Sequence, residues 1–538
     1  MSTSAAHSKV FETPELLGTI CGFAERRTCA TVLLLNQLSF RVAVPFAWNE
    51  VTRVTHLLKL IPGVNVPGVS HSATKITLPP FASADFSRFD MYAPYVRSLE
   101  VHSNTLASPW KTLLLRSKQR PLLQHLSSLT IWQEDHENPI NKELMWMSVF
   151  LTQSLTSIRI RASSGTWIRP ICGASVLLNI IVTSSPQVKY LTLPAISEGT
   201  EEADSEYCLL NLLPDRPVAE SFRALSNLRL LTVSFWIFRN GSLQALGSLP
   251  RLKILRIFPG RFVVGTPEAV PFEENLFPAL GYLQMEKMTW SDAKLALGHR
   301  FLVKNLVSLK LVLKHETGSL GDADDTFLML KGMDRLVKLD INFENQHSYY
   351  VVESGGTFLS ALSQLPLVTV SLSNTRLFNI SELHLGQVFS SLVELRMPDQ
   401  HVDMPEFQFF AAIPNLESLA VALGDSYTIV RVKIEDVTPC PSLITLELTN
   451  KKGDESDKLD PYYAKSIARY FFQLFPNMET IDLPQDTYES STAHQFLSLL
   501  DVCMGLTRER SDARTAIAEQ CGWDVANRLL PDETDFDL

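Results

Sequence analysis

The chain has 538 residues, of which 45% are hydrophobic and 20% are charged, and its formal net charge is -10. This composition is too apolar for a disordered protein, and a single compact domain rarely reaches this length, so we expect several domains or one elongated array. An acidic chain without a cluster of Lys and Arg has no general attraction for nucleic acid or anionic lipid, so neither is an expected partner.

Cysteine usage and the N-terminus favour a protein of the cytoplasm or the nucleus. Seven scattered cysteines with no CxxC pair and no zinc-ligand spacing indicate a reducing compartment and no metal site. Residues 1–10, which we expect to be disordered, lack the apolar core of a secretory signal. The most apolar long stretch, Cys29–Trp48, contains Asn36, Gln37 and Arg41 and is a poor membrane span.

Residues 11–55 predict a small bundle of three helices. Thr13-Pro14-Glu15 is a typical helix start, because Thr can cap, Pro fits the first turn and Glu complements the helix dipole. Thr28 is the expected cap of the second helix. One helical face then collects Leu16, Leu17, Ile20 and Phe23, and later apolar positions are Val32, Leu35, Phe40, Ala43, Phe46 and Trp48. So small a bundle is not stable alone, so we expect it to dock on the rest of the chain or on a partner.

A linker over 56–70, with a helix ending at Pro62-Gly63, precedes a repeat over 71–485. The pattern apolar-x-x-apolar-x-apolar occurs fifteen times, at a mean period of about 29 residues. Its middle residues are Ile76, Leu99, Leu129, Ile158, Leu191, Leu231, Leu255, Leu283, Leu309, Leu339, Val370, Leu395, Leu419, Leu446 and Ile481. The end of each copy alternates like a short half-buried strand, and helix-like segments lie between copies, most clearly over 462–475.

One strand and one helix per period predict an α/β solenoid, with parallel strands on a concave face and helices outside. Such a face suits a protein substrate, and the strand residues expected to point toward it include Thr232, Ser234, Arg256, Gln284, Lys310, Asp340, Asn342 and Arg396. The competing interpretation is that each is only a solvated strand residue. We expect residues 486–530 to form a helical cap and 531–538 an acidic tail.

Motifs for bond chemistry are missing from the sequence. It contains no GxGxxG or GxxxxGK phosphate loop, no HExxH zinc motif and no GxSxG nucleophile turn. We therefore expect no cofactor and no catalysis by this chain. An enzyme that uses a cleft in the solenoid is the third and weakest hypothesis, after the two binding functions given below.

Two family resemblances follow from these motifs. Residues 70–485 resemble the leucine-rich-repeat family, although the Asn or Cys that usually follows the strand is clear only at Asn104. Pro14-Glu15-Leu16-Leu17, Ile20, Leu35-Asn36 and Ala47-Trp48 resemble the F-box of fungal F-box-like proteins, and an F-box before leucine-rich repeats is the layout of one F-box class. Departures from that pattern are Thr13, Cys29 and Ala47.

The second resemblance implies a substrate-recognition subunit of a Skp/cullin/F-box-type ubiquitin ligase. The residues it assigns to the contact with a Skp-type adaptor are Pro14, Leu16, Leu17, Ile20, Phe23, Leu35 and Trp48. Ubiquitin transfer would then belong to partner subunits, and the repeats would hold the substrate close to them. The alternatives are that these helices only cap the first repeat, and that the chain is a protein-interaction scaffold without a ligase.

Overall fold

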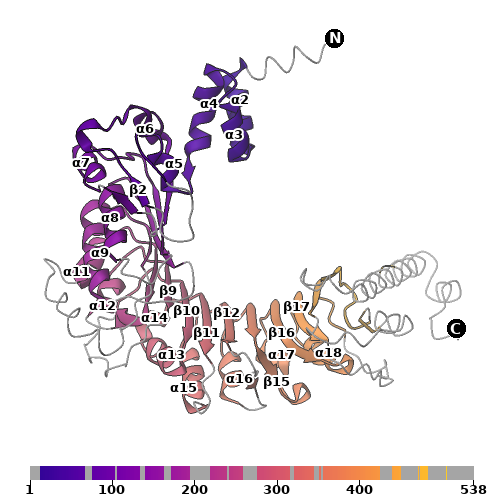
Figure 1. Ribbon diagram of the computed structural model, residues 1–538. Coiled ribbons are helices and arrows are strands. Elements are labelled where there is room, and N and C mark those ends of the chain that lie inside the picture. Colours follow the sequence, from indigo (N-terminus) through magenta and orange to yellow (C-terminus); the bar gives the residue numbers. More distant parts are fainter. Residues whose placement is uncertain are drawn as a thin grey trace, which may run out of the picture. The chain divides into compact units, whose positions relative to one another are not determined.

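A computed structural model of the chain divides into two compact units, Met1–Gly281 and Tyr282–Leu538 (Figure 1). It describes residues 12–66, 75–102, 106–108, 110–133, 140–162, 171–193, 218–238, 241–258, 275–314, 320–344, 350–352, 356–423, 439–449, 470–471, 473–482 and 505. The predicted N-terminal stretch over 1–10, the acidic tail and nearly all of the predicted cap lie outside these residues.

Three helices open the N-terminal unit, namely α2 (Pro14–Phe23), α3 (Arg26–Val32) and α4 (Gln37–Trp48). The helix α3 begins earlier than predicted, because the extended residues Ala24 and Glu25 already complete the turn after α2. Glu25 is therefore the N-cap, and the expectation that Thr28 caps this helix is wrong. The side chain of Asn36 caps α4 by accepting a 2.8 Å hydrogen bond from the Ser39 amide.

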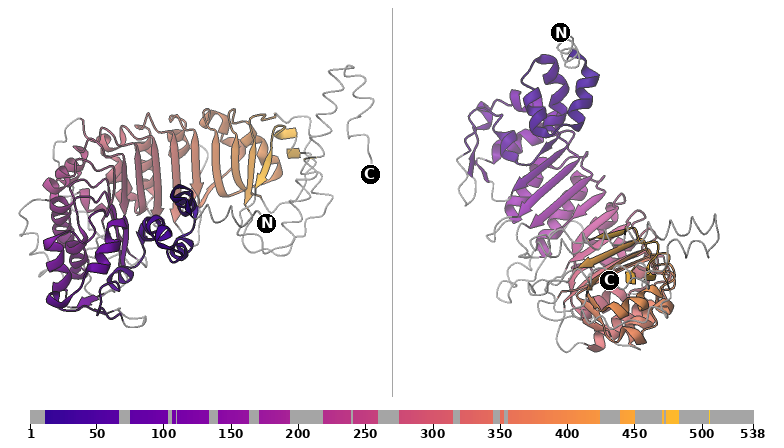
Figure 2. Two further views of the ribbon diagram at one scale, coloured as in Figure 1. Left: turned by 90° about the horizontal axis from the view of Figure 1, so that it is seen from above. Right: turned by 90° about the vertical axis from the view of Figure 1, so that its right-hand side faces the viewer.

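The main sheet of the N-terminal unit is parallel, and its strands follow one another in chain order. These strands are β1 (Glu50–Val51), β3 (Ser98–His102), β5 (Ser128–Gln133), β6 (Ser157–Ala162), β7 (Tyr190–Thr192), β8 (Leu230–Ser234) and β9 (Ile254–Phe258). Along one side of them run α7 (Lys111–Gln119), α8 (Ile140–Phe150), α9 (Ile171–Ser184), α11 (Val218–Ala224) and α12 (Ser242–Gly247) (Figures 1 and 2).

The first copy of the repeat departs from the prediction. Its strand β2 (Lys75–Thr77) pairs with β4 (Leu106–Ser108) in a separate two-stranded sheet. The main sheet instead starts with β1, which pairs with β3 and lies inside the range assigned to the helical bundle. The chain reaches this position directly from α4, because the Asn49 carbonyl accepts hydrogen bonds from the amides of Arg97 and Ser98, each 2.9 Å long. Short helices α5 (Val54–Leu58) and α6 (Ser87–Tyr92) occupy the intervening segment.

The C-terminal unit repeats the same arrangement. Its parallel strands are β10 (Tyr282–Met288), β11 (Ser308–Lys314), β12 (Lys338–Glu344), β14 (Thr369–Ser373), β16 (Glu394–Val402), β17 (Ser418–Leu423), β18 (Thr445–Thr449) and β19 (Thr480–Asp482). Its helices are α13 (Trp290–Leu297), α14 (Arg300–Val303), α15 (Leu320–Leu330), α16 (Thr357–Leu362), α17 (Leu385–Val388) and α18 (Phe407–Ala411). A separate pair, β13 (Tyr350–Val352) and β15 (Thr375–Leu377), is also parallel.

The register of the strands confirms the repeat. The middle residues of successive copies are direct partners, as in Leu99, Leu129 and Ile158, or in Leu309, Leu339 and Val370. All of these side chains are buried, and the helices between the strands cover them. Apart from the first copy, each unit is built as the sequence predicts, and the protein folds as an α/β leucine-rich-repeat solenoid.

Candidate functional site: an apolar helical face and a polar sheet face

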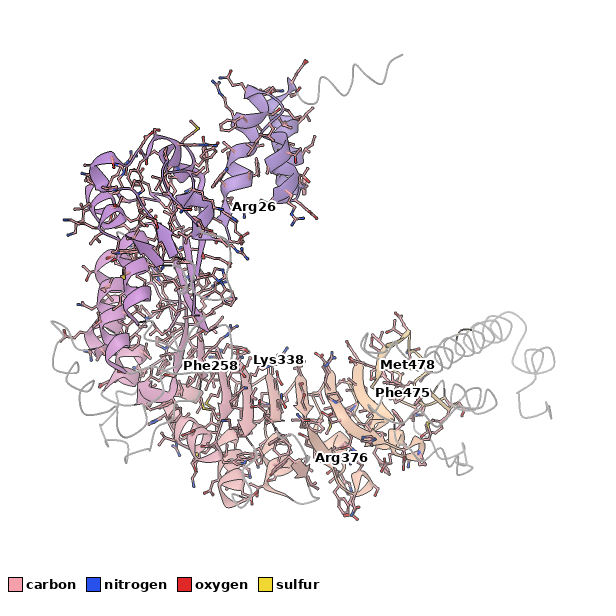
Figure 3. The ribbon with its side chains drawn as sticks, in the orientation of Figure 1. Arg26, Phe258, Lys338, Arg376, Phe475 and Met478 are labelled. Atoms are coloured by element: carbon pink, nitrogen blue, oxygen red, sulfur yellow. The ribbon has the colours of Figure 1, made fainter. Side chains whose placement is uncertain are left out.

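The helical bundle has a small core of its own. Its buried residues are Leu17, Cys21, Cys29, Val32, Ala43 and Ala47. The helices α2 and α4 pack against each other near Gly18 and Gly22, where an added Cβ would lie at an ordinary contact distance of 3.7 Å from Val42 or Phe46. Arg26 lies at the end of the bundle next to the sheet, where its Nε donates to the Ala47 carbonyl at 3.1 Å (Figure 3).

One contact region joins this bundle to the first repeats. The ring of Trp48 lies 4.6 Å from that of Tyr92 in α6, and Phe40 meets the same ring edge-on at 6.1 Å. The predicted docking on the rest of the chain therefore uses α4. Trp48 is half-buried in this contact, so only part of its ring remains for a partner.

Apolar side chains are unusually exposed on the bundle. Among the described residues, six of the thirteen large exposed hydrophobic side chains lie between positions 16 and 46, and they are Leu16, Ile20, Phe23, Leu34, Leu35 and Phe46. Phe23 is 91% exposed and Leu34 is 85% exposed. Because an exposed apolar group gains free energy when a partner covers it, this concentration makes the bundle the candidate interaction surface.

The residues assigned to the adaptor contact fall into two groups. Leu16, Ile20 and Phe23 lie within about 60° of one another around α2, at 100° per residue, and with Pro14 and Leu35 they are exposed. Leu17 lies about 60° from Ile20 around the helix. It is completely buried in the bundle core, so it supports the fold and has no surface for a partner. Leu34 and Phe46 are exposed positions that sequence reasoning did not include, although both belong to the apolar stretch Cys29–Trp48.

On the sheet face, two of the predicted substrate-facing residues are not accessible. Thr232 is 4% exposed and Ser234 is fully buried, so the expectation that they present surface to a partner is wrong. The short side chain of Thr232 lies between its register partners Thr192 on β7 and Arg256 on β9, and Ser234 lies beside Phe258 on β9, which leaves both little accessible area.

The remaining predicted residues are accessible, but most are engaged with one another. Lys310 pairs with Asp340 across β11 and β12 at 3.0 Å, and this hydrogen bond raises the pKa of Lys310 above its ordinary value. Arg396 pairs with Glu447 at 2.6 Å, reaching across the buried Ala420 of the strand between them. Asn342 accepts a 2.9 Å hydrogen bond from Asn374.

The other two, Arg256 and Gln284, are half-buried. Gln284 contacts Glu286 and accepts a 3.0 Å hydrogen bond from the hydroxyl of Tyr282. Arg256 has no ion pair within the described part of the chain. The sheet face of the C-terminal unit is therefore largely neutralised by its own pairs.

An aromatic and cationic cluster on β3, β5 and β6 was missed. His102, Trp132 and Arg161 are register partners on these strands. The ring centres of His102 and Trp132 are 6.4 Å apart, and the two rings are stacked. The guanidinium of Arg161 lies 5.3 Å from the centre of the Trp132 ring. Each of the three directly follows the last apolar residue of its copy. A comparison of this following residue across the copies would have revealed the cluster from the sequence.

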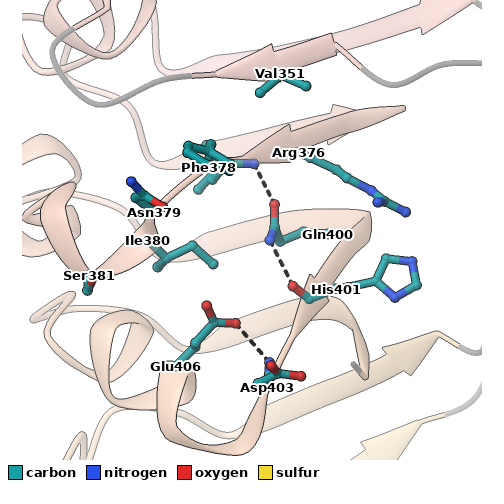
Figure 4. Close-up of a pocket in the computed structure, with 11 residues that line it drawn as sticks. Val351, Arg376, Phe378, Asn379, Ile380, Ser381, Gln400, His401, Asp403 and Glu406 are labelled. Atoms are coloured by element: carbon teal, nitrogen blue, oxygen red, sulfur yellow. Dashed lines mark hydrogen bonds between the residues drawn. The ribbon is translucent and has the colours of Figure 1, made fainter. Parts of the chain in front are cut away.

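The C-terminal unit has an open hollow of about 640 Å³ beside β13, β15 and the end of β16 (Figure 4). Its polar lining is used by the fold, since Gln400 accepts from the Leu377 amide at 2.6 Å and donates to the His401 carbonyl at 2.9 Å. The Glu406 carboxylate accepts from the Asp403 amide at 2.9 Å, and burial raises the pKa of Glu406. These groups close a turn, and they do not form a nucleophile with a base.

Two other kinds of site, a metal site and a membrane span, are absent from the described residues. No group of three or more His, Cys, Asp or Glu side chains is placed to hold a metal ion. None of the described helices combines the length and the hydropathy that crossing a membrane requires.

No protein-family model and no curated protein sequence matches this chain. Among solved structures, TLR13 in its complex with ssRNA13 aligns over 73% of this chain and 61% of its own, with 11% identity and a TM-score of 0.30. The Drosophila Toll–Spatzle complex aligns over 66% and 48%, with 13% identity and a TM-score of 0.28. The LRIM1/APL1C complex aligns over 85% and 72%, with 11% identity and a TM-score of 0.24.

These three are leucine-rich-repeat proteins. The fold class stated above rests on the strand register and on the placement of the helices.

Proposed function

We propose that this leucine-rich-repeat protein is the substrate-recognition subunit of a Skp/cullin/F-box-type ubiquitin ligase. The observation that carries the proposal is the exposed apolar face of the bundle, Leu16, Ile20 and Phe23 on α2 with Leu35 after α3. These are four of the seven positions that the F-box resemblance assigns to a Skp-type adaptor.

The construction of the bundle supports this role. A bundle that only capped the first repeat would bury its apolar residues in its own core or against that repeat. Leu17 and Cys21 are buried in this way, in a core that they share with residues of α3 and α4. The outward set would remain in water without a partner. Aromatic and aliphatic side chains that become covered in this way are typical anchors of protein interfaces.

The repeats supply the second half of the proposed function. A sheet face of strand side chains is a surface for holding a protein, and no described cluster is arranged for bond chemistry. The chain then raises the effective concentration of substrate near the transferring enzyme, and partner subunits carry out the transfer.

Co-purification of the intact chain with a Skp-type adaptor tests the proposal. We expect the wild-type chain to recover the adaptor, and the double variant Ile20→Asp/Phe23→Asp to lose it while its circular dichroism is unchanged. The matched control is Val351→Asp/Phe378→Asp, which places the same charges on exposed apolar residues of the C-terminal unit. A wild-type chain that recovers no adaptor, beside an F-box protein that does, would favour a scaffold without a ligase.

A further inference from the structure

Three neighbouring strands of the N-terminal unit are each preceded by a cation. Lys189, Arg229 and Lys253 stand directly before β7, β8 and β9, and we call them the cation strip. The Arg229 amide donates to the Lys189 carbonyl at 2.8 Å, and the Lys253 amide donates to the Arg229 carbonyl at 2.9 Å. Neighbouring strands are about 4.8 Å apart, so three like charges lie side by side, which is unfavourable without a counter-charge.

The part of the chain that the structure describes does not supply that counter-charge. Within the described residues, none of the three side chains makes an ion pair or a hydrogen bond, and Arg229 and Lys253 are exposed. A bound anionic group would relieve the repulsion. The strip is not visible as a cluster of Lys and Arg in the sequence, because its members are 40 and 24 residues apart.

An apolar row lies beside the cation strip. Tyr190, Leu230 and Ile254 are the first residues of the same strands and are direct register partners. Tyr190 is 39% exposed, and Leu230 and Ile254 are half-buried. The edge of this sheet therefore presents positive charge and apolar surface in two adjacent lines.

The C-terminal unit shows that the solenoid does not require cations at this position. The equivalent residues before β11, β12, β14 and β16 are Val307, Val337, Val368 and Val393, joined by the same backbone hydrogen bonds. Two cations on the sheet of that unit have acidic partners, since Lys310 pairs with Asp340 and Arg396 pairs with Glu447. Unpaired cations in a row are thus a particular property of β7–β9.

We infer that the cation strip and the apolar row bind a segment of the protein substrate in which acidic and apolar residues alternate. The inference rests on the proposed function and names the class of substrate. In an extended peptide, successive side chains point to opposite sides, so the acids can face the strip while the apolar residues face Leu230 and Ile254. Three strands span about 10 Å, which matches about three extended residues and an acid–apolar–acid core.

The apolar row decides between a peptide and a nucleic acid. Single-stranded nucleic acid would also satisfy the cations, but it binds by stacking bases on aromatic rings. Tyr190 is the one ring in the apolar row, and its two partners in the row, Leu230 and Ile254, offer aliphatic side chains next to the cation strip. The nearest aromatic cluster with a cation has its indole, Trp132, between His102 and Arg161 on the flanking strands.

The test is fluorescence anisotropy with the intact chain and a labelled peptide, Gly-Asp-Leu-Asp-Phe-Asp-Leu-Gly. We expect binding that weakens between about 50 and 300 mM NaCl, and none by the same peptide with Asn in place of Asp. The variant Arg229→Glu/Lys253→Glu should bind about tenfold more weakly or worse. The control Lys304→Glu/Arg335→Glu makes the same change of charge at exposed positions of the C-terminal unit and should bind like the wild type.

Several outcomes would overturn the inference. Three of them are equal binding of the Asp and Asn peptides, an affinity that does not depend on salt, and an unchanged affinity in Arg229→Glu/Lys253→Glu. A fourth is that an oligothymidylate of about twelve nucleotides binds more tightly than the peptide and that Arg229→Glu/Lys253→Glu abolishes this binding. Peptide binding only after removal of residues 531–538 would also overturn it, because the acidic tail would then be the occupant. Adaptor recovery is measured on the same preparations. Loss of the adaptor with retained peptide binding refutes the ligase proposal, and the reverse refutes only this inference.

Discussion

Replacement of Phe23 by Ala separates the two kinds of apolar residue on α2. Phe23 is 91% exposed, whereas Leu17 is completely buried in the bundle core. If the outward face of α2 docks on a Skp-type adaptor, then Phe23→Ala weakens that complex and leaves the free protein as stable as before. Leu17→Ala should do the opposite, because its side chain contributes to folding and has no surface left to offer.

The expected magnitudes follow from the exposed fractions. Full burial of a Phe side chain is worth about 1.5–3 kcal/mol, and almost all of that gain is still available at Phe23, so its loss costs about 2 kcal/mol or about 30-fold in Kd. Ile20 is 43% exposed, and Ile20→Ala should cost about half as much, which is about fivefold. Leu17→Ala should lower the free energy of unfolding of the bundle by about 3–5 kcal/mol.

Calorimetric titration of the adaptor into each variant measures the three values, and hydrogen exchange of the α2 and α4 amides reports the stability of the bundle. The reasoning is refuted if Phe23→Ala binds the adaptor like the wild type. It is also refuted if Leu17→Ala reduces binding while the exchange rates of the bundle stay unchanged, since the buried side chain would then act at the interface.

Three further predictions concern local structure. Asn36→Ala removes the side chain that caps α4 at 2.8 Å, so exchange of the first α4 amides should accelerate by an amount equivalent to about 1 kcal/mol. Gly386→Ala would place a Cβ 2.3 Å from the Ala412 carbonyl oxygen and should cost about 1–3 kcal/mol in urea unfolding. Gly281→Ala, which meets nothing within 4 Å, should cost less. Burial lowers the pKa of His299 below its ordinary 6.5, so the unfolded chain takes up a proton that the folded chain resists. The stability of the wild-type chain should therefore fall as the pH drops below 6.5. From about one pH unit above this value to about one unit below it, His299→Gln should lose less stability than the wild type.

Much of the fold could be predicted because the repeat is a local pattern. The residues Leu129, Ile158 and Leu191 were identified as equivalent from spacing alone, and they are register partners in the sheet. A strand with one buried face needs alternating side chains, and this requirement appears in a few consecutive residues. The bundle helices were predicted for the same reason, although the start of α3 was not.

The candidate sites were predicted less well, because accessibility depends on neighbours that are distant in the sequence. Helical spacing placed Leu16 and Leu17 on one face, but packing against α3 and α4 buries only Leu17. Thr232 has an outward position in its strand, and yet its neighbours on β7 and β9 leave it inaccessible. The strand β1 was missed because Glu50–Val51 does not carry the repeat pattern and lies beside β3 only in the folded chain.

The sequence by itself determined the periodic elements of this protein and the buried residue at each step, because period and polarity are written within single copies of the repeat. The tertiary structure was needed to establish which apolar side chains of the bundle stay in water, which charges on the sheet neutralise one another, and that Thr232 and Ser234 are buried. Those properties arise between strands and helices that the chain brings together across dozens of residues, where stacking and not spacing sets the distance between two side chains.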